Sequence, residues 1–289
     1  AVLMLPCSCS VDEIQEASDG LKTISKIEAS IDDAPVTKAH LEGTDKVKWN
    51  PWDAIGIYSD TDNPVLFTTN GDGVFQSSSG RTVSGHEFYA YYPYYQASLS
   101  AENRKELRFD NSFPSSGENP YLNLPIIAKS DGSTLSFKHA AGVLHFSLTG
   151  TQVLKSVTLW ANGSEHIAGM GTIDLEEDIP VLKIDNSGST VMIMTLGEPV
   201  QLTKDKPFDI WFGLPPITLS QGFTLFMVFE GGSISKTTDK AVTITRATIK
   251  NYSVVDLNQI IEDEEAELAA EREALIALYN ATDGPHWNN

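Results

Sequence analysis

Side chains that commonly do chemistry are sparse in this sequence, and their spacing matches no known catalytic pattern. The six histidines are scattered at positions 40, 86, 139, 145, 166 and 286. The chain has no HExxH, GxSxG, Walker or GxGxxG motif. Adjacent acids such as Glu176 and Glu177 point to opposite faces of a strand, so they cannot flank one glycosidic bond. We therefore predict no catalytic residue and expect a protein that is not an enzyme.

Carboxylates that could hold a hard cation occur near two predicted turns. The segment "SDTDNP" contributes Asp60 and Asp62, and "NGDG" adds Asp72. Oxygen ligands of this kind suit calcium, but the spacing of an EF-hand and its distal glutamate are missing. Hydrogen bonds from the backbone of a turn to these side chains would also explain their presence. The prediction is that the protein binds no metal and no cofactor.

The stretch "HEFYAYYPYY" at 86–95 holds five of the nine tyrosines. In a strand, Phe88, Ala90 and Tyr92 face one way and the two tyrosines between them face the other. Burying one ring contributes roughly 2–3 kcal/mol. Four rings left in water would forgo on the order of 10 kcal/mol, which is comparable to the stability of a whole domain. We therefore expect at least one face of this strand to lie in a core.

Three aromatic residues are candidates for an exposed stacking surface. Pro93 has no N–H to donate and should end the strand. Tyr94 and Tyr95 follow it, and Trp52 lies in an earlier segment, "KWNPWDAIGIYS". We predict that these three rings are candidates for stacking against a ligand, and that the ligand would be a sugar.

The elements that must position these side chains are predicted to be short strands. From about residue 22 to 257, β-rich runs such as "KIEASI", "PVLFTT", "GVLHFSLT" and "FDIWFGLPP" are bounded by Gly, Pro, Asn or Asp. The "NG" and "DG" pairs at 70–73 predict a hairpin. Few helical patterns interrupt these runs, which favours β-sandwiches. The best boundary between two sandwiches lies near 148–156.

After the last strand the apolar period becomes helical. Ile261, Leu268 and Leu275 recur every seven residues in an Ala- and Glu-rich background. Asp256 and Gln259 could form a capping box at the helix start. The pattern predicts an acidic α-helix with one apolar stripe, and a solvated linker helix remains an alternative.

The charge balance excludes one class of partner. The chain carries 39 acidic and 20 basic residues, for a net charge of −19. Such a balance repels phosphate backbones, and the sequence has no basic stripe, so we expect no nucleic acid. It also has no run of about 18 apolar residues, so we expect no membrane-spanning helix.

The start of the chain, "AVLMLPCSCS", holds both cysteines, Cys7 and Cys9. A disulfide between them would be strained because they lie two residues apart. The run resembles the end of a bacterial lipoprotein signal, and Cys9 is the better lipid acceptor because small Ser8 precedes it. The following "SVDE" resembles the export tag of surface lipoproteins in Bacteroides-like bacteria. Residues 1–20 are thus expected to be a signal remnant and acidic linker, the alternative being a frayed end with inert cysteines.

Several stretches, in order, resemble the fimbrillin-like surface proteins of Bacteroides-type bacteria. They are "KVKWNPWDAIGIYS", "HEFYAYYPY", "LPIIAKSDGSTLSFKHAAGVLHFSL" and "GLPPITLSQGFTLFMVFEGG" followed by "ITRATIKNYSVVDL". The resemblance implies an all-β chain of two tandem transthyretin-like β-sandwiches, at 21–150 and 151–257. It also implies a non-catalytic lipoprotein at the surface of the outer membrane, acting in adhesion or in the assembly of a fimbria (pilus).

The same resemblance implies partners and a processing site. In such fimbriae a strand of one subunit fills a groove of the next, and a trypsin-like protease first removes the N-terminal strand after a basic residue. Here that strand would be about 21–32, and Lys38 is the candidate for cleavage. The expected partners are other fimbrial subunits or a surface receptor, and outer-membrane lipid through Cys9.

The C-terminal segment "EREALIALYNATDGPHWNN" resembles the N-terminal cap that precedes leucine-rich repeats in bacterial surface proteins. Residues 258–289 are therefore expected to form an acidic helix that begins such a cap, truncated here. A module attached there would tether the last strand, so an anchor, a tip or a stand-alone adhesin fits better than a stalk subunit. The alternative function is a carbohydrate-binding surface lipoprotein that uses exposed tyrosine and tryptophan rings.

Overall fold

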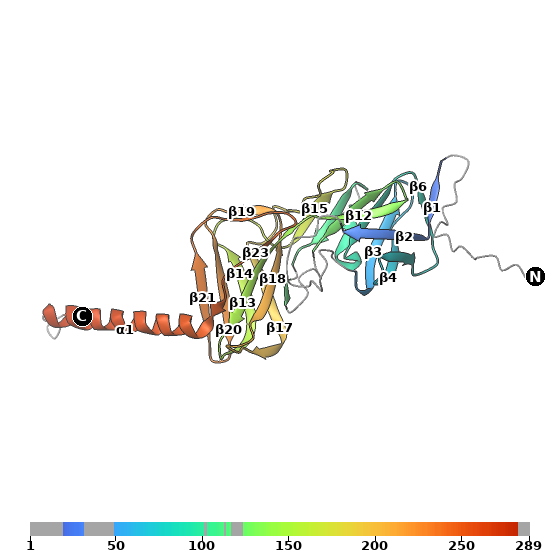
Figure 1. Ribbon diagram of the computed structural model, residues 1–289. Helices are drawn as coiled ribbons and strands as arrows, with labels where there is room; N and C mark the ends of the chain where they lie inside the picture. Colours follow the sequence, from blue (N-terminus) through green and yellow to red (C-terminus); the bar gives the residue numbers. More distant parts are fainter. Residues whose placement is uncertain (1–19, 32–48, 101–102, 113, 117–123, 283–289) are drawn as a thin grey trace, which may run out of the picture.

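The computed structural model describes residues 20–31, 49–100, 103–112, 114–116 and 124–282. These residues form many short strands, followed by one long helix, α1 (Leu257–Ala281). In Figure 1 the strands gather into two bodies that meet near β15 (Met170–Asp174), and α1 projects from the far end of the second body. The predicted all-β fold with a C-terminal acidic helix is confirmed.

Seven strands of the first body, here called the barrel, close into a ring in the order β11-β12-β2-β5-β4-β3-β7. Its interior is an apolar core that includes Phe67, Phe75, Phe88 and Phe137, all fully buried. The strands are β2 (Lys26–Ile31), β3 (Pro51–Ser59), β4 (Val65–Asn70), β5 (Val74–Ser77), β7 (Phe88–Tyr92), β11 (Ile126–Ser130) and β12 (Thr134–His139).

The hairpin predicted at 70–73 joins β4 to β5. Gly71 and Gly73 have positive φ angles of 94° and 81°, a conformation that glycine adopts without a steric penalty. The Asp72 carboxylate accepts hydrogen bonds from the Thr69 hydroxyl at 3.2 Å and the Val74 amide at 2.9 Å. Asp72 therefore stabilises the turn through these hydrogen bonds, as its sequence context favours.

The second body, here called the sandwich, has two main sheets, and their strand orders are β17-β14-β20-β21 and β10-β18-β13-β23. Leu144, Phe146 and Leu148 point into the core between these sheets, as the alternation in "GVLHFSLT" indicates. The strands are β10 (Ser115–Ser116), β13 (Gly142–Thr149), β14 (Val153–Ala161), β17 (Val191–Gln201), β18 (Phe208–Leu214), β20 (Phe223–Phe229), β21 (Gly232–Thr238), β23 (Ile249–Asn251) and β24 (Val255–Asp256), which also pairs with β13.

A third cluster of buried side chains, here called the joining core, contains residues from both bodies. Tyr58 and Tyr89 come from the barrel, Trp211 comes from the sandwich, and Leu107 and Phe109 come from β9 (Glu106–Asp110). The remaining elements are β1 (Lys22–Ile24) paired with β6 (Val83–Gly85), β8 (Ala97–Leu99), β15 and β16 (Lys183–Ile184) in one sheet with β9, β19 (Ile217–Leu219) paired with β22 (Val242–Ile244), and the short 3-10 helix η2 (Tyr94–Gln96).

The division predicted between residues 150 and 151 stays a prediction. Strand β13 precedes that point in the chain, and it pairs with β18, β23 and β24, which follow it. Its Val143 side chain lies in the joining core, whereas Leu144 lies in the core of the sandwich. One strand therefore contributes to two clusters, because its side chains alternate between faces.

Helix α1 is fixed at its first turn and exposed beyond it. Asp256 is the N-cap, and its carboxylate accepts a hydrogen bond from the Asn258 amide at 3.0 Å. Gln259 instead donates to the Asp263 carboxylate at 2.9 Å, so the residue expected to complete a capping box bonds forward along the helix. Leu268 and Leu275 of the predicted stripe are 65% and 66% exposed. Among the described residues, no helix combines the length and hydropathy needed to cross a bilayer.

Candidate functional site

The aromatic stretch 86–95 divides at the end of its strand. Phe88 and Ala90 lie in the barrel core, and Tyr89 and Tyr91 lie in the joining core. Both faces of β7 are therefore buried, which goes beyond the one buried face that the energetic argument requires. Strand β7 ends at Tyr92, immediately before the proline, as predicted.

Tyrosine rings continue from the joining core to the surface. Tyr58 stacks on Tyr89, with ring centroids 5.3 Å apart. Tyr91 lies parallel to Tyr94 at 6.1 Å, with 6° between the ring planes. Tyr94 in turn meets Tyr95 edge-on at 5.1 Å. Tyr95 is 80% exposed, so this series of ring contacts ends in solvent.

Close backbone approach lets Tyr91 lie flat against its neighbouring strand. Gly56 on β3 is paired with Tyr91 on β7. A Cβ atom at Gly56 would lie 2.3 Å from the Tyr91 Cζ atom, so any larger residue would displace the ring. The absence of a side chain at Gly56 therefore sets the position of the first ring that lines the site.

Burial fixes the protonation of the inner rings. Removal from water raises the pKa of Tyr58 and of Tyr91, because the charged phenolate is the form that burial disfavours. Burial also raises the pKa of Tyr89, and its hydrogen bond to the Glu87 carboxylate at 2.9 Å adds to the effect. These rings remain neutral hydrogen-bond donors through the physiological pH range. The Tyr58 hydroxyl donates to the Arg104 carbonyl at 2.9 Å, which ties this core to the pocket described next.

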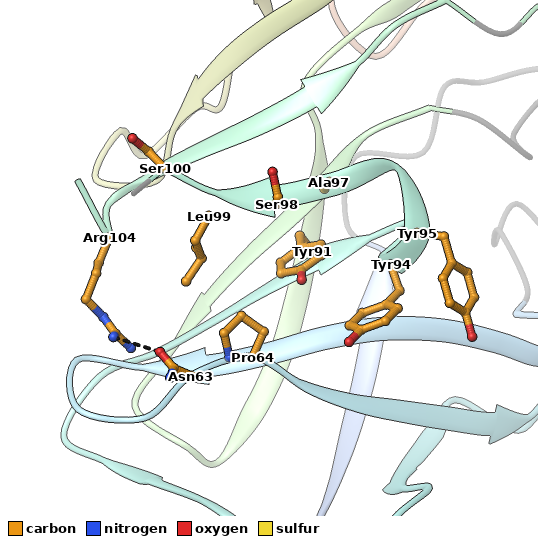
Figure 2. Close-up of a pocket in the computed structure, with 10 residues that line it drawn as sticks. All are labelled: Asn63, Pro64, Tyr91, Tyr94, Tyr95, Ala97, Ser98, Leu99, Ser100 and Arg104. Atoms are coloured by element: carbon orange, nitrogen blue, oxygen red, sulfur yellow. Dashed lines mark hydrogen bonds between the residues drawn. The ribbon is translucent and has the colours of Figure 1, made fainter. Parts of the chain in front are cut away.

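An open pocket of about 620 Å³ lies where the series of rings reaches the surface, and we call it the tyrosine pocket. Figure 2 shows Arg104 and Asn63 at one end and Tyr94 and Tyr95 at the other, with Tyr91 between them. Its volume is within the range of small-molecule sites, about 300–1,000 Å³. The remaining lining residues are Pro64, Ala97, Ser98, Leu99 and Ser100.

Arg104 is held in place by oxygen atoms of the loop after β3. Its Nη1 atom donates to the Asn63 side-chain oxygen at 3.1 Å, and its Nη2 atom donates to the Ser59 carbonyl at 3.0 Å and to the Asp62 carbonyl. All three acceptors are uncharged, so no carboxylate among these contacts offsets the positive charge of the guanidinium. The arrangement can bind a ligand that offers an apolar ring face at one end and an acceptor at the other.

The predicted stacking residues occupy two different places. Tyr94 and Tyr95 meet in the tyrosine pocket. Trp52 is 78% exposed but is not among the residues that line the pocket. It lies at an irregularity in the pairing of β3 with β4 and has a positive φ of 73°, a strained conformation for a bulky residue. The carboxylate of its neighbour Asp53 accepts a hydrogen bond from the Tyr92 hydroxyl at 3.3 Å.

Sequence reasoning missed the polar end of the pocket. Asn63 precedes Tyr94 by 31 residues and Arg104 follows it by 10, and neither belongs to a motif. They come together because β3 pairs with β7, while β8 returns along β9. No local signal marks them, since the pairing of strands creates the site.

The strand predicted at 21–32 corresponds to β1 and β2. Strand β2 lies between β12, with which it is parallel, and β5, with which it is antiparallel. It is therefore hydrogen-bonded on both sides within the barrel, and Ile27 is buried in the barrel core. The predicted lipid acceptor Cys9 and the predicted cleavage site Lys38 lie outside the described residues, and both stay predictions.

Several of the other histidines and acidic residues noted in the sequence form hydrogen bonds and ring contacts with residues close to them in the fold. The Asp60 carboxylate accepts a hydrogen bond from the His86 amide at 2.9 Å and lies 3.1 Å from the Nδ1 atom of the His86 ring. His145 stacks on Trp211 with ring centroids 3.6 Å apart and lies 3.0 Å from the Asp209 carboxylate. Within the described ranges, no group of three or more His, Cys, Asp or Glu side chains is placed to hold a metal ion.

Comparison with known proteins shows what the fold resembles. No protein-family model matches the sequence, and no curated protein matches it. A crystal structure of a candidate cell adhesion protein from Bacteroides ovatus superposes with a TM-score of 0.55 and 14% identity, covering 78% of this chain and 90% of that one. One from Bacteroides uniformis gives a TM-score of 0.49 and 15% identity, covering 79% and 93%. The chain therefore shares its fold with the first of these structures.

Proposed function

We propose that this chain is a fimbrillin-like, non-catalytic surface protein that acts in adhesion or in the assembly of fimbriae, as an anchor, a tip or a stand-alone adhesin. The observation that carries the proposal is its likeness in fold, over 90% of the solved chain, to the candidate cell adhesion protein of Bacteroides ovatus. The lipoprotein-like start of the sequence supports a place at the outer-membrane surface, with Cys9 as the lipid acceptor.

The position of β2 supports assembly through strand exchange. Removing β1 and β2 would open the closed ring and leave unpaired backbone groups on β5 and β12. It would also vacate the places that Ile24 and Ile27 fill in the barrel core. A strand from another subunit would restore both the hydrogen bonds and the burial. Cleavage at Lys38, after β2, would release this segment together with Cys9, so it would also detach the chain from the proposed lipid anchor.

The start of α1 supports an anchor or tip in preference to a stalk subunit. Strand β24 pairs with β13, and Leu257 immediately after it is buried in the core of the sandwich. The Thr151 and Gln152 side chains each donate to the Asn258 side-chain oxygen at 2.9 Å. The last strand is thus tied at the point where the helix begins, which does not suit a strand that must leave to fill another subunit.

Limited digestion of the full chain with trypsin tests the assembly proposal. We expect cleavage after Lys38, identified by N-terminal sequencing, to leave a folded core with an open ring. Because the last strand of this core is tied, the core should stay monomeric in light scattering, and it should bind an added peptide 21–32 that supplies the missing strand. The matched control is the same peptide with Ile27→Asp, which cannot enter the apolar core. A cleaved core that fails to bind the native peptide would reject assembly by strand exchange.

A second candidate function, carbohydrate binding, is favoured by the tyrosine pocket. Exposed Tyr95 and half-buried Tyr94 present ring surface beside polar groups of Asn63 and Ser98. Sugars offer both apolar ring faces and hydroxyl groups, which such a surface can bind. A glycan array compares the native chain with Tyr95→Ala, and glycan binding that is lost in the variant supports this function.

A further inference from the structure

We infer that the tyrosine pocket binds a carbohydrate that carries a carboxylate, with the acidic group at Arg104 and a neighbouring sugar ring at Tyr94 and Tyr95. The inference rests on the second candidate function, carbohydrate binding, and names the class of sugar. It does not depend on fimbrial assembly.

The charge of the pocket is opposite to that of the chain. Acidic residues outnumber basic ones by 39 to 20 in the whole sequence. Among the described residues that line the pocket, however, Arg104 alone carries a charge, and none is acidic. A neutral sugar would need no such local reversal. An anionic group placed here meets a cation and no neighbouring carboxylate within the lining.

Arg104 is positioned by the protein and retains binding capacity. A guanidinium has five N–H donors, and described residues engage three of them through the oxygens of Asn63, Ser59 and Asp62. These contacts hold the side chain at the end of the pocket without neutralising it. Donors beyond those three are available for a carboxylate, which forms stronger hydrogen bonds with a guanidinium than a hydroxyl does.

The two proposed contact points for the ligand lie at opposite ends of the pocket. Figure 2 places Arg104 and Tyr95 at opposite ends of the pocket, with Pro64 and Tyr91 between them. A ligand that reaches both must extend along the pocket. The Tyr95 ring stands edge-on to Tyr94 and is 80% exposed, so its face is available to a sugar ring. An acidic disaccharide is a suitable probe, because it offers a carboxylate on one unit and the face of a second ring for Tyr95.

The test uses the full chain and three matched ligands: the β-1,4-linked disaccharide of glucuronic acid and glucose, its methyl ester, and cellobiose. Binding is followed by NMR titration. We expect the acid to bind at least about 10-fold more tightly than the ester or cellobiose, because only the acid adds a charge-assisted contact. Its affinity should also fall as salt concentration rises.

Two variants and a control locate the site. Arg104→Gln should reduce binding of the acid to the level of cellobiose, and Tyr95→Ala should weaken all three ligands. Arg81→Gln makes the same change of charge at an exposed residue that does not line the pocket, and should change nothing. If Arg104→Gln fails to fold, the preference of the native chain for the acid, together with weaker acid binding in Tyr95→Ala, still decides the question.

The outcomes separate this inference from the function on which it rests. Equal binding of the acid and cellobiose, lost in Tyr95→Ala, would overturn the inference and leave carbohydrate binding in place. Binding of none of the ligands would overturn both. Preference for the acid that survives both Arg104→Gln and Tyr95→Ala would place the site elsewhere and would also overturn the inference.

Discussion

Two sets of aromatic rings in the barrel differ in what surrounds them, although some are neighbours in sequence. Phe88 through Tyr91 lie on a strand that pairs with β3 and β11 and are buried on both faces. Tyr95 lies just after the proline, and Trp52 lies at an irregular place in β3, and both are largely exposed. The comparison shows that the rings of β7 are buried because the barrel core covers one face of the strand and the joining core covers the other, whereas Tyr95 and Trp52 lie outside both cores.

The largest expected effect is on the stability of the barrel. Phe88→Ala removes a fully buried ring from the barrel core and should lower the free energy of unfolding by about 3–5 kcal/mol. Urea denaturation measures it. Tyr95→Ala is the control from the exposed set and should change the free energy of unfolding by no more than about 0.5 kcal/mol. Equal losses in the two variants would break the comparison.

The next effect concerns the close contact between β3 and β7 at Gly56, which positions the Tyr91 ring. Gly56→Ala puts a Cβ atom against the Tyr91 ring, so it should destabilise the fold by about 1–3 kcal/mol. Gly197→Ala is the matched control, because no heavy atom lies within 4 Å of the Cβ position at Gly197. Thermal unfolding of the two variants checks this. A Gly56→Ala protein as stable as the control would show that the ring moves freely.

A smaller effect should appear at alkaline pH. Because burial raises the pKa of Tyr91 above the value of about 10 in an unfolded chain, the folded protein keeps a proton that the unfolded chain releases. The free energy of unfolding therefore falls as pH rises above about 10. Tyr91→Phe should make that fall shallower by up to about 1.4 kcal/mol per pH unit. Urea denaturation between pH 9 and 11, on the order of one unit either side of that pKa, measures the slope, and identical slopes for native and variant proteins would contradict the buried environment.

The smallest effect has the opposite sign. Trp52→Gly replaces a strained, exposed residue with one that adopts a positive φ without penalty, so stability should rise by up to about 1 kcal/mol. Trp160 is also exposed, but it lies within β14 without a positive φ, so Trp160→Gly should lower stability by about 0.5–1 kcal/mol. If both substitutions destabilise alike, the Trp52 side chain contributes packing that its exposure does not indicate.

The local pattern of the sequence predicted much of the fold because it depends on short-range rules. Alternation correctly placed Phe88 and Ala90 on one face of a strand and the tyrosines between them on the other, and the two glycines at 70–73 marked a hairpin. Asp256 was correctly placed at the helix start, although the partner expected from the capping box was wrong. The closing of seven strands into a ring was not predicted, because strand order depends on contacts between residues far apart in the chain.

For the site, the position of Tyr94 and Tyr95 after Pro93 singled them out in the sequence, because a proline without an N–H ends the strand. Only the tertiary structure decided that Tyr94 and Tyr95 share a pocket with Arg104 and that Trp52 does not line it. The physical reason is that a side chain's own neighbours along the chain determine which face it takes, whereas the pairing of distant strands determines which faces meet.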